Sequence, residues 1–137
     1  MVDLETIEVS GWARPKGYAN GIVTPGRGER ILFVAGQVGW IDGRVPTEDF
    51  VEQFGLALDN VLAVVRAAGG DAASVARMTV YATDLSSYRK EQRRLGEVWR
   101  AKMGRHYPTM ALIGVAELLE EGAKVEIEAT CVLAGPA

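Results

Sequence analysis

The stretch HYPTMALIGVAELLEEGAKVEIEATC, residues 106–131, decides much of the fold. It predicts a short buried strand over Met110–Val115, a turn, and a longer strand over Lys124–Leu133. Side chains of a strand point alternately to its two faces, so the longer strand has an apolar row and a row with carboxylates. The apolar row is Val125, Ile127, Ala129 and Cys131, and the other is Glu126, Glu128 and Thr130. We expect the apolar row to meet helices and the carboxylate row to face water, a pocket or another subunit.

The remaining chain predicts two helices and further strands. Apolar residues from Phe50 to Val65 recur with a helical period, and a second helix ending at Gly104 has a shorter apolar stripe. That stripe consists of Leu95, Val98, Trp99 and Met103. The expected N-caps are Thr47 for the first helix and Ser86 or Ser87 for the second. Strands are predicted over residues 21–24, 31–35 and 78–83, with an extra strand over residues 6–9 at the start.

These elements predict one α+β domain spanning residues 1–137, a mixed sheet with two helices on one face. The other face of the sheet is then uncovered. The run ILFVA, residues 31–35, is apolar at every position and would place apolar side chains on that face beside the carboxylates. Such a surface favours oligomerisation through the open face.

Composition narrows the classes of function. A net charge of −3 argues against nucleic acid as the partner, since phosphate binding needs a basic surface. With one cysteine and one histidine, an internal disulfide is excluded and a metal site is not expected. Neither a signal peptide nor an apolar run long enough to span a membrane is present, so we expect a cytoplasmic protein without membrane contact.

Six segments follow one another along nearly the whole chain in a familiar order. They are GYANG (17–21), LFVAGQVG (32–39), QFGLALDNVLAVVRAAGG (53–70), MTVYATDL (78–85), YPTMALIGV (107–115) and VEIEA (125–129). Together they resemble the Rid family, also called YjgF or endoribonuclease L-PSP. The resemblance implies a chorismate-mutase-like α+β fold and a homotrimer whose sheets form a central β-barrel. It also implies clefts between subunits that bind small molecules, and hydrolysis of imines or enamines without a cofactor.

The resemblance also implies where the site lies. Tyr18 matches the family tyrosine near the N-terminus, Gly36 the glycine of the SGQ motif, and Glu126 the first glutamate of VEIEA. Tyr18 and Glu126 are therefore the candidate catalytic residues, and Glu126 would orient or deprotonate the water. Gly36 and its neighbours Ala35 and Gln37 are candidates for lining the pocket.

The chain departs from the family pattern at Met110, where the motif P-A-R has an arginine, and at Ala35, which replaces the serine of SGQ. A guanidinium grips a substrate carboxylate with two hydrogen bonds, and Met110 offers neither charge nor donor. Activity towards 2-imino acids is therefore expected to be low, with Met110 as the compliant wall of a pocket for a neutral or more apolar ligand. The cations that could substitute are Arg14, Lys16, Arg105 and His106.

Three functions follow as hypotheses. The first is a homotrimeric hydrolase that deaminates an imine, enamine or related small molecule. The second is a non-catalytic module that binds small ligands or protects proteins. The third is the ribonuclease activity that one family name suggests, against which the acidic balance and the single histidine argue.

Overall fold

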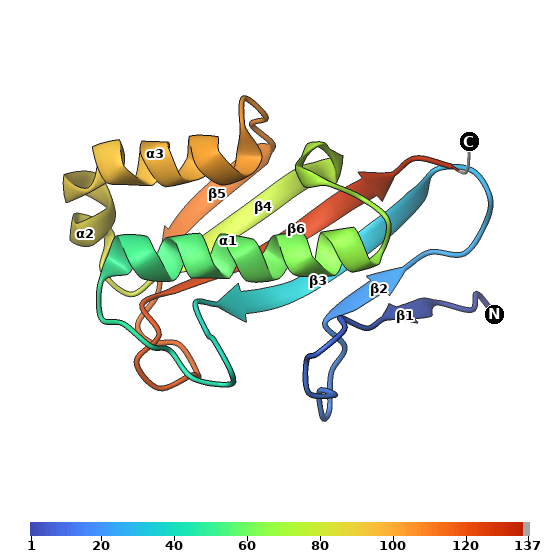
Figure 1. The fold of residues 1–137 in the computed structure, drawn as a ribbon, viewed down its shortest axis with the longest axis horizontal. Coiled ribbons are helices and arrows are strands. Elements are labelled where there is room, and N and C mark those ends of the chain that lie inside the picture. Colours follow the sequence, from blue (N-terminus) through green and yellow to red (C-terminus); the bar gives the residue numbers. More distant parts are fainter. Residues whose placement is uncertain (136–137) are drawn as a thin grey trace.

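The computed structural model describes residues 1–135 and shows a six-stranded sheet with three α-helices (Figure 1). The strands are β1 (Glu5–Ile7), β2 (Gly21–Val23), β3 (Arg30–Val38), β4 (Val75–Ala82), β5 (Thr109–Gly114) and β6 (Val125–Leu133). The helices are α1 (Phe50–Ala67), α2 (Leu85–Lys90) and α3 (Gln92–Met103), with a 3₁₀ turn η1 over Ala72–Ser74. The mixed α+β class expected from the sequence is confirmed.

The strands lie in the order β1-β2-β3-β6-β4-β5. All neighbours are antiparallel except β4 and β5, which are parallel. The long strand β6 therefore lies in the middle of the sheet, between β3 and β4. The strand predicted over Met110–Val115 is present as β5, but the prediction that it is buried was wrong. Among the described residues β5 pairs with β4 alone and its other edge is open, which leaves most of its residues exposed.

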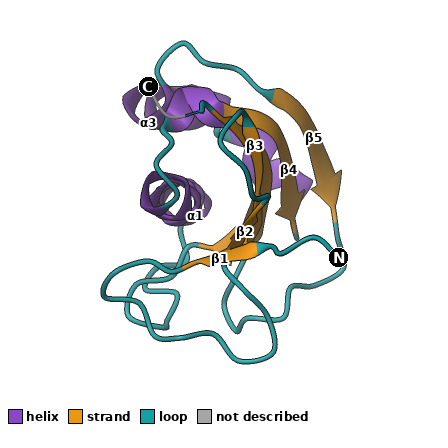
Figure 2. Ribbon diagram, turned by 90° about the vertical axis from the view of Figure 1, so that its right-hand side faces the viewer, coloured by secondary structure: helices purple, strands orange, loops and turns teal. Residues whose placement is uncertain are grey.

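Helices α1 and α3 lie on the same face of the sheet (Figure 2). Helix α1 runs across that face, and its apolar stripe packs against the inward rows of β3 and β6, in one core that also includes the inward row of β4. Fully buried side chains such as Leu58, Leu62, Met78 and Ile127 form the centre of this core, each contributing about 1.5–3 kcal/mol by burial. The alternation predicted for β6 is confirmed, since Val125, Ile127, Ala129 and Cys131 are all buried in the core.

The second predicted helix is in fact two helices, α2 and α3, that meet at Glu91. The backbone of Glu91 leaves helical geometry at φ −106° and ψ 20°. The N-cap predicted at Ser86 or Ser87 was also wrong, because Asp84 accepts from the backbone amide of Ser86. Both serines instead donate their hydroxyls to the carboxylate of Asp84.

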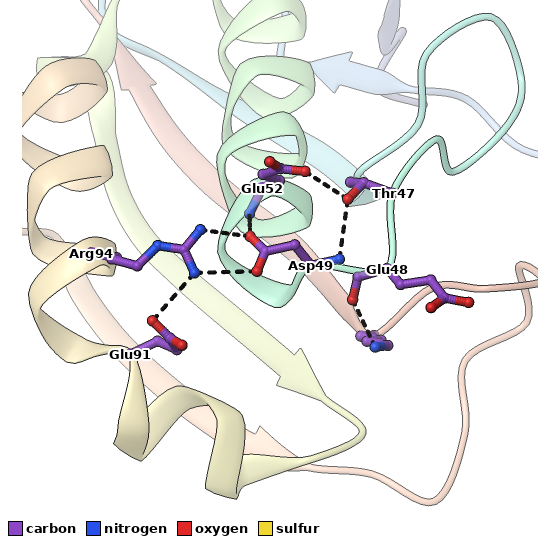
Figure 3. Close-up of polar contacts among 7 residues, drawn as sticks. Thr47, Glu48, Asp49, Glu52, Glu91 and Arg94 are labelled. Atoms are coloured by element: carbon purple, nitrogen blue, oxygen red, sulfur yellow. Dashed lines mark hydrogen bonds and ion pairs between the residues drawn. The ribbon is translucent and has the colours of Figure 1, made fainter.

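The N-cap of α1 is Asp49 rather than the predicted Thr47. Asp49 has extended backbone geometry, and its carboxylate accepts from the amide of Glu52 at 2.9 Å. Thr47 lies two residues before Asp49, and its hydroxyl accepts from the amide of Asp49 (Figure 3). Asp49 also forms an ion pair with Arg94 of α3, whose guanidinium reaches its carboxylate at 2.8 Å. One carboxylate therefore caps α1 and ties it to α3.

Replacing Asp49 with alanine is expected to lower the free energy of unfolding by about 1–2 kcal/mol, mainly through the lost cap. Asp49→Asn retains an acceptor for the helix amides and loses only the ion pair, so its loss should be smaller. The hydrogen bond from Arg94, more than the Glu52 amide, lowers the pKa of Asp49. The advantage of wild type over Asp49→Asn should therefore be complete above the ordinary aspartate pKa and disappear as the pH falls through the lowered value. Urea denaturation of the three proteins at several pH values measures this, and equal losses for both variants would contradict the assigned roles.

The open face of the sheet carries both apolar and charged side chains. On β3, Leu32 and Val34 are buried while Ile31 and Phe33 point outwards, with Phe33 49% exposed. Val132 of β6 and Ile113 of β5 share this outer face and are more than two-fifths exposed. We name the outer side chains Ile31, Phe33, Ile113 and Val132 the apolar patch of the open face. The patch has the character that the run ILFVA predicted.

Candidate functional site

The carboxylate of Glu126 lies directly against the backbone of Gly36. A β-carbon built on Gly36 would be 2.8 Å from both Cδ and Oε1 of Glu126, so any larger residue at this position would displace the Glu126 carboxylate. The pairing of β3 with β6 shifts between Val34 and Gln37, and Gly36 lies within this irregularity. The glycine therefore provides the space in which the Glu126 side chain lies.

The start of β6 is held by the buried side chain of Gln53 on α1. Its amide nitrogen donates to the carbonyl of Gly122 at 3.0 Å, and its oxygen accepts from the amide of Lys124 at 2.8 Å. These bonds fix the chain two residues before Glu126 and so set the register that places this carboxylate on the open face. Sequence reasoning missed Gln53, because a lone glutamine within an apolar helix stripe gives no indication of its distant partners.

Burial raises the pKa of the Glu126 carboxyl, and the negative charges of Glu128 and Glu120 raise it further. Among residues 1–135, Glu126 forms no ion pair with a cation. A half-buried carboxylate with a raised pKa and acidic neighbours can accept a proton from water more readily than an ordinary glutamate.

Glu128, the next carboxylate of the row, has a partner on β4. Tyr81 lies directly across from Glu126 in the β4–β6 ladder, and its hydroxyl donates to Oε1 of Glu128. This hydrogen bond raises the pKa of Tyr81, with burial as a smaller contribution. Sequence reasoning did not single out Tyr81. The available signal was the alternation of MTVYAT, which places Tyr81 on the face opposite to the buried Met78 and Val80.

The segment around Gly36 contains the candidates Ala35 and Gln37 and contacts the loop in which the third candidate, Tyr18, lies. Gln37 points to the helix side, where it is buried and donates to Asn20 Oδ1 at 3.3 Å. The amide of Ala35 donates to the carbonyl of Asn20 at 2.8 Å. These contacts hold the loop before β2 beside Ala35, and Tyr18 lies in that loop with 62% of its surface exposed. Gln37 thus holds the backbone near Gly36, while the Tyr18 residue is largely exposed to solvent.

Met110 lies away from Glu126 within one chain. It is paired with the buried Met78, and its neighbour Leu112 packs against the core, so Met110 belongs to the helix-side face of the edge strand β5. Its side chain is nevertheless 43% exposed, because nothing covers the outer edge of β5 among the described residues. Met110 and Glu126 can border one cleft only if they come from different copies of the chain.

Of the four cations that could substitute for an arginine at position 110, two have polar partners within the chain and two are exposed. Arg14 pairs with Glu8 at 3.2 Å, and Nε2 of His106 lies 2.6 Å from the carbonyl of Val75. Arg105 and Lys16 are exposed.

Within residues 1–135, no group of three or more His, Cys, Asp or Glu side chains is arranged to hold a metal ion. No helix in this part of the chain has both the length and the apolar character that crossing a membrane requires.

Two cavities among the described residues lie elsewhere. One, of about 560 Å³, lies between α1 and α3 beside Arg94, and the other, of about 700 Å³, lies beside Arg30 and Leu133. Neither is lined by Glu126, Gly36 or Tyr18. The carboxylate row of β6 therefore borders an open surface in the isolated chain.

Comparison with known proteins gives consistent matches over this fold. The family described as Endoribonuclease L-PSP matches residues 14–133. The RutC family protein y4sK of Sinorhizobium fredii is 38% identical over 102 residues, which cover 72% of this chain and 76% of that protein. TdcF of Escherichia coli K12 is 35% identical over 107 residues, covering 74% of this chain and 78% of TdcF. The human 2-iminobutanoate/2-iminopropanoate deaminase is 26% identical over 106 residues, covering 76% and 74%.

Solved structures match over almost the whole length. The crystal structure of E. coli TdcF with bound serine superposes with a TM-score of 0.79 at 31% identity, covering 95% of this chain and 99% of that one. The crystal structure of the YjgF gene product of E. coli gives a TM-score of 0.78 at 28% identity, covering 93% and 98%. The likeness thus extends over the sheet, the helices and the segments around Gly36 and Glu126.

Proposed function

This chain belongs to the endoribonuclease L-PSP family, also called the Rid or YjgF family, and on that premise we propose that it hydrolyses a small imine or enamine without a cofactor. The site proposed for this reaction is a cleft between two copies of the chain, with Glu126 as the base. The single observation that carries the proposal is the Glu126 carboxylate, lying in the space left by Gly36 with a raised pKa.

The relatives support the class of chemistry. One of them is named a 2-iminobutanoate/2-iminopropanoate deaminase, and another was crystallised with serine, a small amino acid. The family match spans residues 14–133, which include Gly36 and Glu126. Deamination of an imine needs only water and a group that moves protons, and the carboxylate row of β6 supplies such a group.

The proposed reaction is a hydrolysis. Glu126 takes a proton from a water molecule, whose oxygen forms a bond with the imine carbon while the C=N electron pair moves to nitrogen, and Glu126 then gives this proton to the nitrogen. Glu126 next takes the proton of the new hydroxyl group and passes it to the nitrogen as the carbon–nitrogen bond breaks, so that ammonia leaves and a carbonyl product remains. An enamine enters the same sequence after it is protonated to the imine. No electron acceptor or donor is needed.

Assembly of copies through the open face is part of the proposal. The side chains of the apolar patch, Ile31, Phe33, Ile113 and Val132, are each more than two-fifths exposed, and burying them favours association. We propose a homotrimer whose sheets form a barrel, as the family resemblance implies. In such an assembly the exposed edge of β5, with Met110, can lie beside the carboxylate row of another copy and close the cleft.

Met110 is proposed to limit the reaction with substrates that carry a carboxylate. Met110→Arg supplies a guanidinium that can hold a carboxylate with two hydrogen bonds, and we expect kcat/KM for 2-imino acids to rise by about 10²-fold. An amino acid oxidase acting on alanine or leucine generates the 2-imino acid in place, and a coupled assay follows keto-acid and ammonia release with and without the protein. Met110→Leu is the matched control and should leave the rate unchanged.

The outcomes of this assay separate the hypotheses. Acceleration by wild type or by Met110→Arg supports a hydrolytic site bordered by position 110. If neither protein accelerates release from the imino acids, or from imines generated by an amine oxidase, the chain is not a deaminase and a non-catalytic ligand-binding role takes its place.

A further inference from the structure

We propose that Tyr81 is a positioning residue of this site, which holds the Glu128 carboxylate at a fixed place beside Glu126. The inference rests on the proposed function, because it assigns a role in the chemistry of Glu126. Tyr81 would not contact the substrate; it would act through Glu128.

The geometry of three neighbouring strands supports this role. Tyr81 on β4 is paired with Glu126 on β6, while Glu128, two residues further along β6, is paired with Thr79. The Tyr81 side chain reaches along the sheet to Glu128 and donates its hydroxyl to Oε1. Glu126 meanwhile lies towards β3, against Gly36. Tyr81 therefore engages the second carboxylate and leaves the first one free.

The hydroxyl is the part of Tyr81 that this arrangement requires. A phenylalanine ring could pack on the same half-buried surface, but it could not donate to Glu128. A tyrosine hydroxyl is protonated at neutral pH, and the hydrogen bond to Glu128 raises the pKa of Tyr81 further, so the hydroxyl remains a donor. Glu128 is consequently kept close to Glu126 instead of turning into water.

Few charged groups share the surroundings of Glu126. Glu128 lies on its own strand, Tyr81 and Arg77 lie on β4, and Glu120 lies in the loop before β6. Lys124 directs its amino group to the carbonyl of Glu48 at 2.7 Å, and the facing part of β3 is the uncharged Gly36 segment. The like charge of a fixed Glu128 opposes ionisation of Glu126, so the position of Glu128 affects how basic Glu126 is.

The test compares wild type with Tyr81→Phe, Glu128→Gln and the double variant. Two measurements are made: the titration of Glu126, followed by carboxyl carbon NMR in the protein without substrate, and the pH profile of kcat/KM for an enzymatically generated imine. Tyr88→Phe, a half-buried tyrosine of α2 on the other side of the sheet, is the matched control. Urea denaturation checks that every variant is folded.

We expect Glu128→Gln to shift both the Glu126 titration and the acidic limb of the pH profile to lower pH. Tyr81→Phe should shift them in the same direction, since a released Glu128 moves away from Glu126, and the double variant should match Glu128→Gln. A Tyr81→Phe profile identical to wild type, or a double variant in which the two shifts add, would overturn the role of Tyr81. Coupled titrations without any hydrolysis by wild type would instead overturn the proposed function, because the NMR titration needs no substrate.

Discussion

Replacing Glu126 by glutamine is expected to lower kcat/KM for imine hydrolysis by about 10²- to 10⁴-fold, the range over which a positioned general base accelerates a reaction. Glutamine keeps nearly the same size and fits the space beside Gly36, but it cannot accept a proton from water. The loss should fall on kcat more than on KM, since proton transfer occurs in the transition state and not on binding. Initial rates of keto-acid or aldehyde formation over a range of substrate concentrations measure both constants.

The fold should tolerate this change. Glu126 is half-buried between Gly36 and the rest of the carboxylate row, and its charge is opposed by those of Glu128 and Glu120. Removing one like charge relieves repulsion, so Glu126→Gln should be at least as resistant to urea as wild type. Glu121→Gln, on an exposed loop residue of the same segment, is the matched control and should keep full activity. A Glu126→Gln variant that retains more than a tenth of wild-type activity would remove Glu126 from the mechanism.

The pH dependence gives a second view of the same residue. Since burial, and then the charges of Glu128 and Glu120, raise the pKa of Glu126, the carboxylate form needed as a base is lost at a higher pH than for an exposed glutamate. Activity should therefore fall on acidification while the protein is still folded. This fall of activity at acidic pH should be absent from the residual activity of Glu126→Gln, because glutamine does not titrate.

The sequence predicted the features of the fold that depend on local periodicity. The alternation of VEIEATCVL was enough to assign one face of β6 to the core and the other to the carboxylates, because a strand has a period of two. The pattern could not show that β5 is an edge strand with Met110 exposed on its helix side. That depends on pairing between segments far apart in the chain, which leaves no trace in the periodicity of either.

The predicted N-caps of the helices were wrong for a different reason. Thr47 and Asp49 are both suitable N-caps by residue type, and so are Asp84 and the serines after it. The backbone decides between them, since the cap must have extended geometry while its side chain reaches the first turn. Asp49, at φ −71° and ψ 123°, meets that condition, and its ion pair with Arg94 adds a partner that residue type alone does not indicate.

At the site, residue types suggested Glu126 and Gly36 through the family resemblance, whereas their contact depends on the shifted pairing between Val34 and Gln37. A shift of this kind is a property of two strands together and cannot be inferred from one of them. The same is true of Tyr81 and Glu128, which are 47 residues apart in the chain. The contributions of Tyr18 and Met110 depend on a further level, the assembly, and stay predictions.

Phe33→Asp is expected to turn the proposed homotrimer into a monomer. Phe33 lies on β3 in the apolar patch, with Thr130 of β6 and Ile22 of β2 beside it in the sheet. In one chain it is half exposed, so an aspartate there should cost little folding stability. In an assembly that buries the open face, each copy would bring an unpaired carboxylate into an apolar interface. The desolvation penalty of several kcal/mol per charge is enough to prevent association. Multi-angle light scattering should give three times the chain mass of 14.8 kDa for wild type and one times that mass for the variant.

The activity of this monomer decides whether the site is shared between copies. Glu126, Gly36 and Tyr81 remain in place in Phe33→Asp, so a site complete within one chain would keep its rate, whereas a cleft closed by β5 of another copy would lose hydrolysis together with assembly. We expect the second result, since Met110 and Glu126 lie on opposite faces of the sheet and neither of the two cavities described above is lined by Glu126. Ile41→Asp, equally exposed but in the loop after β3, is the matched control and should remain a trimer with full activity. A wild-type protein that is monomeric at all concentrations, or a monomeric variant with wild-type kcat/KM, would show that the open face is not where the site is completed.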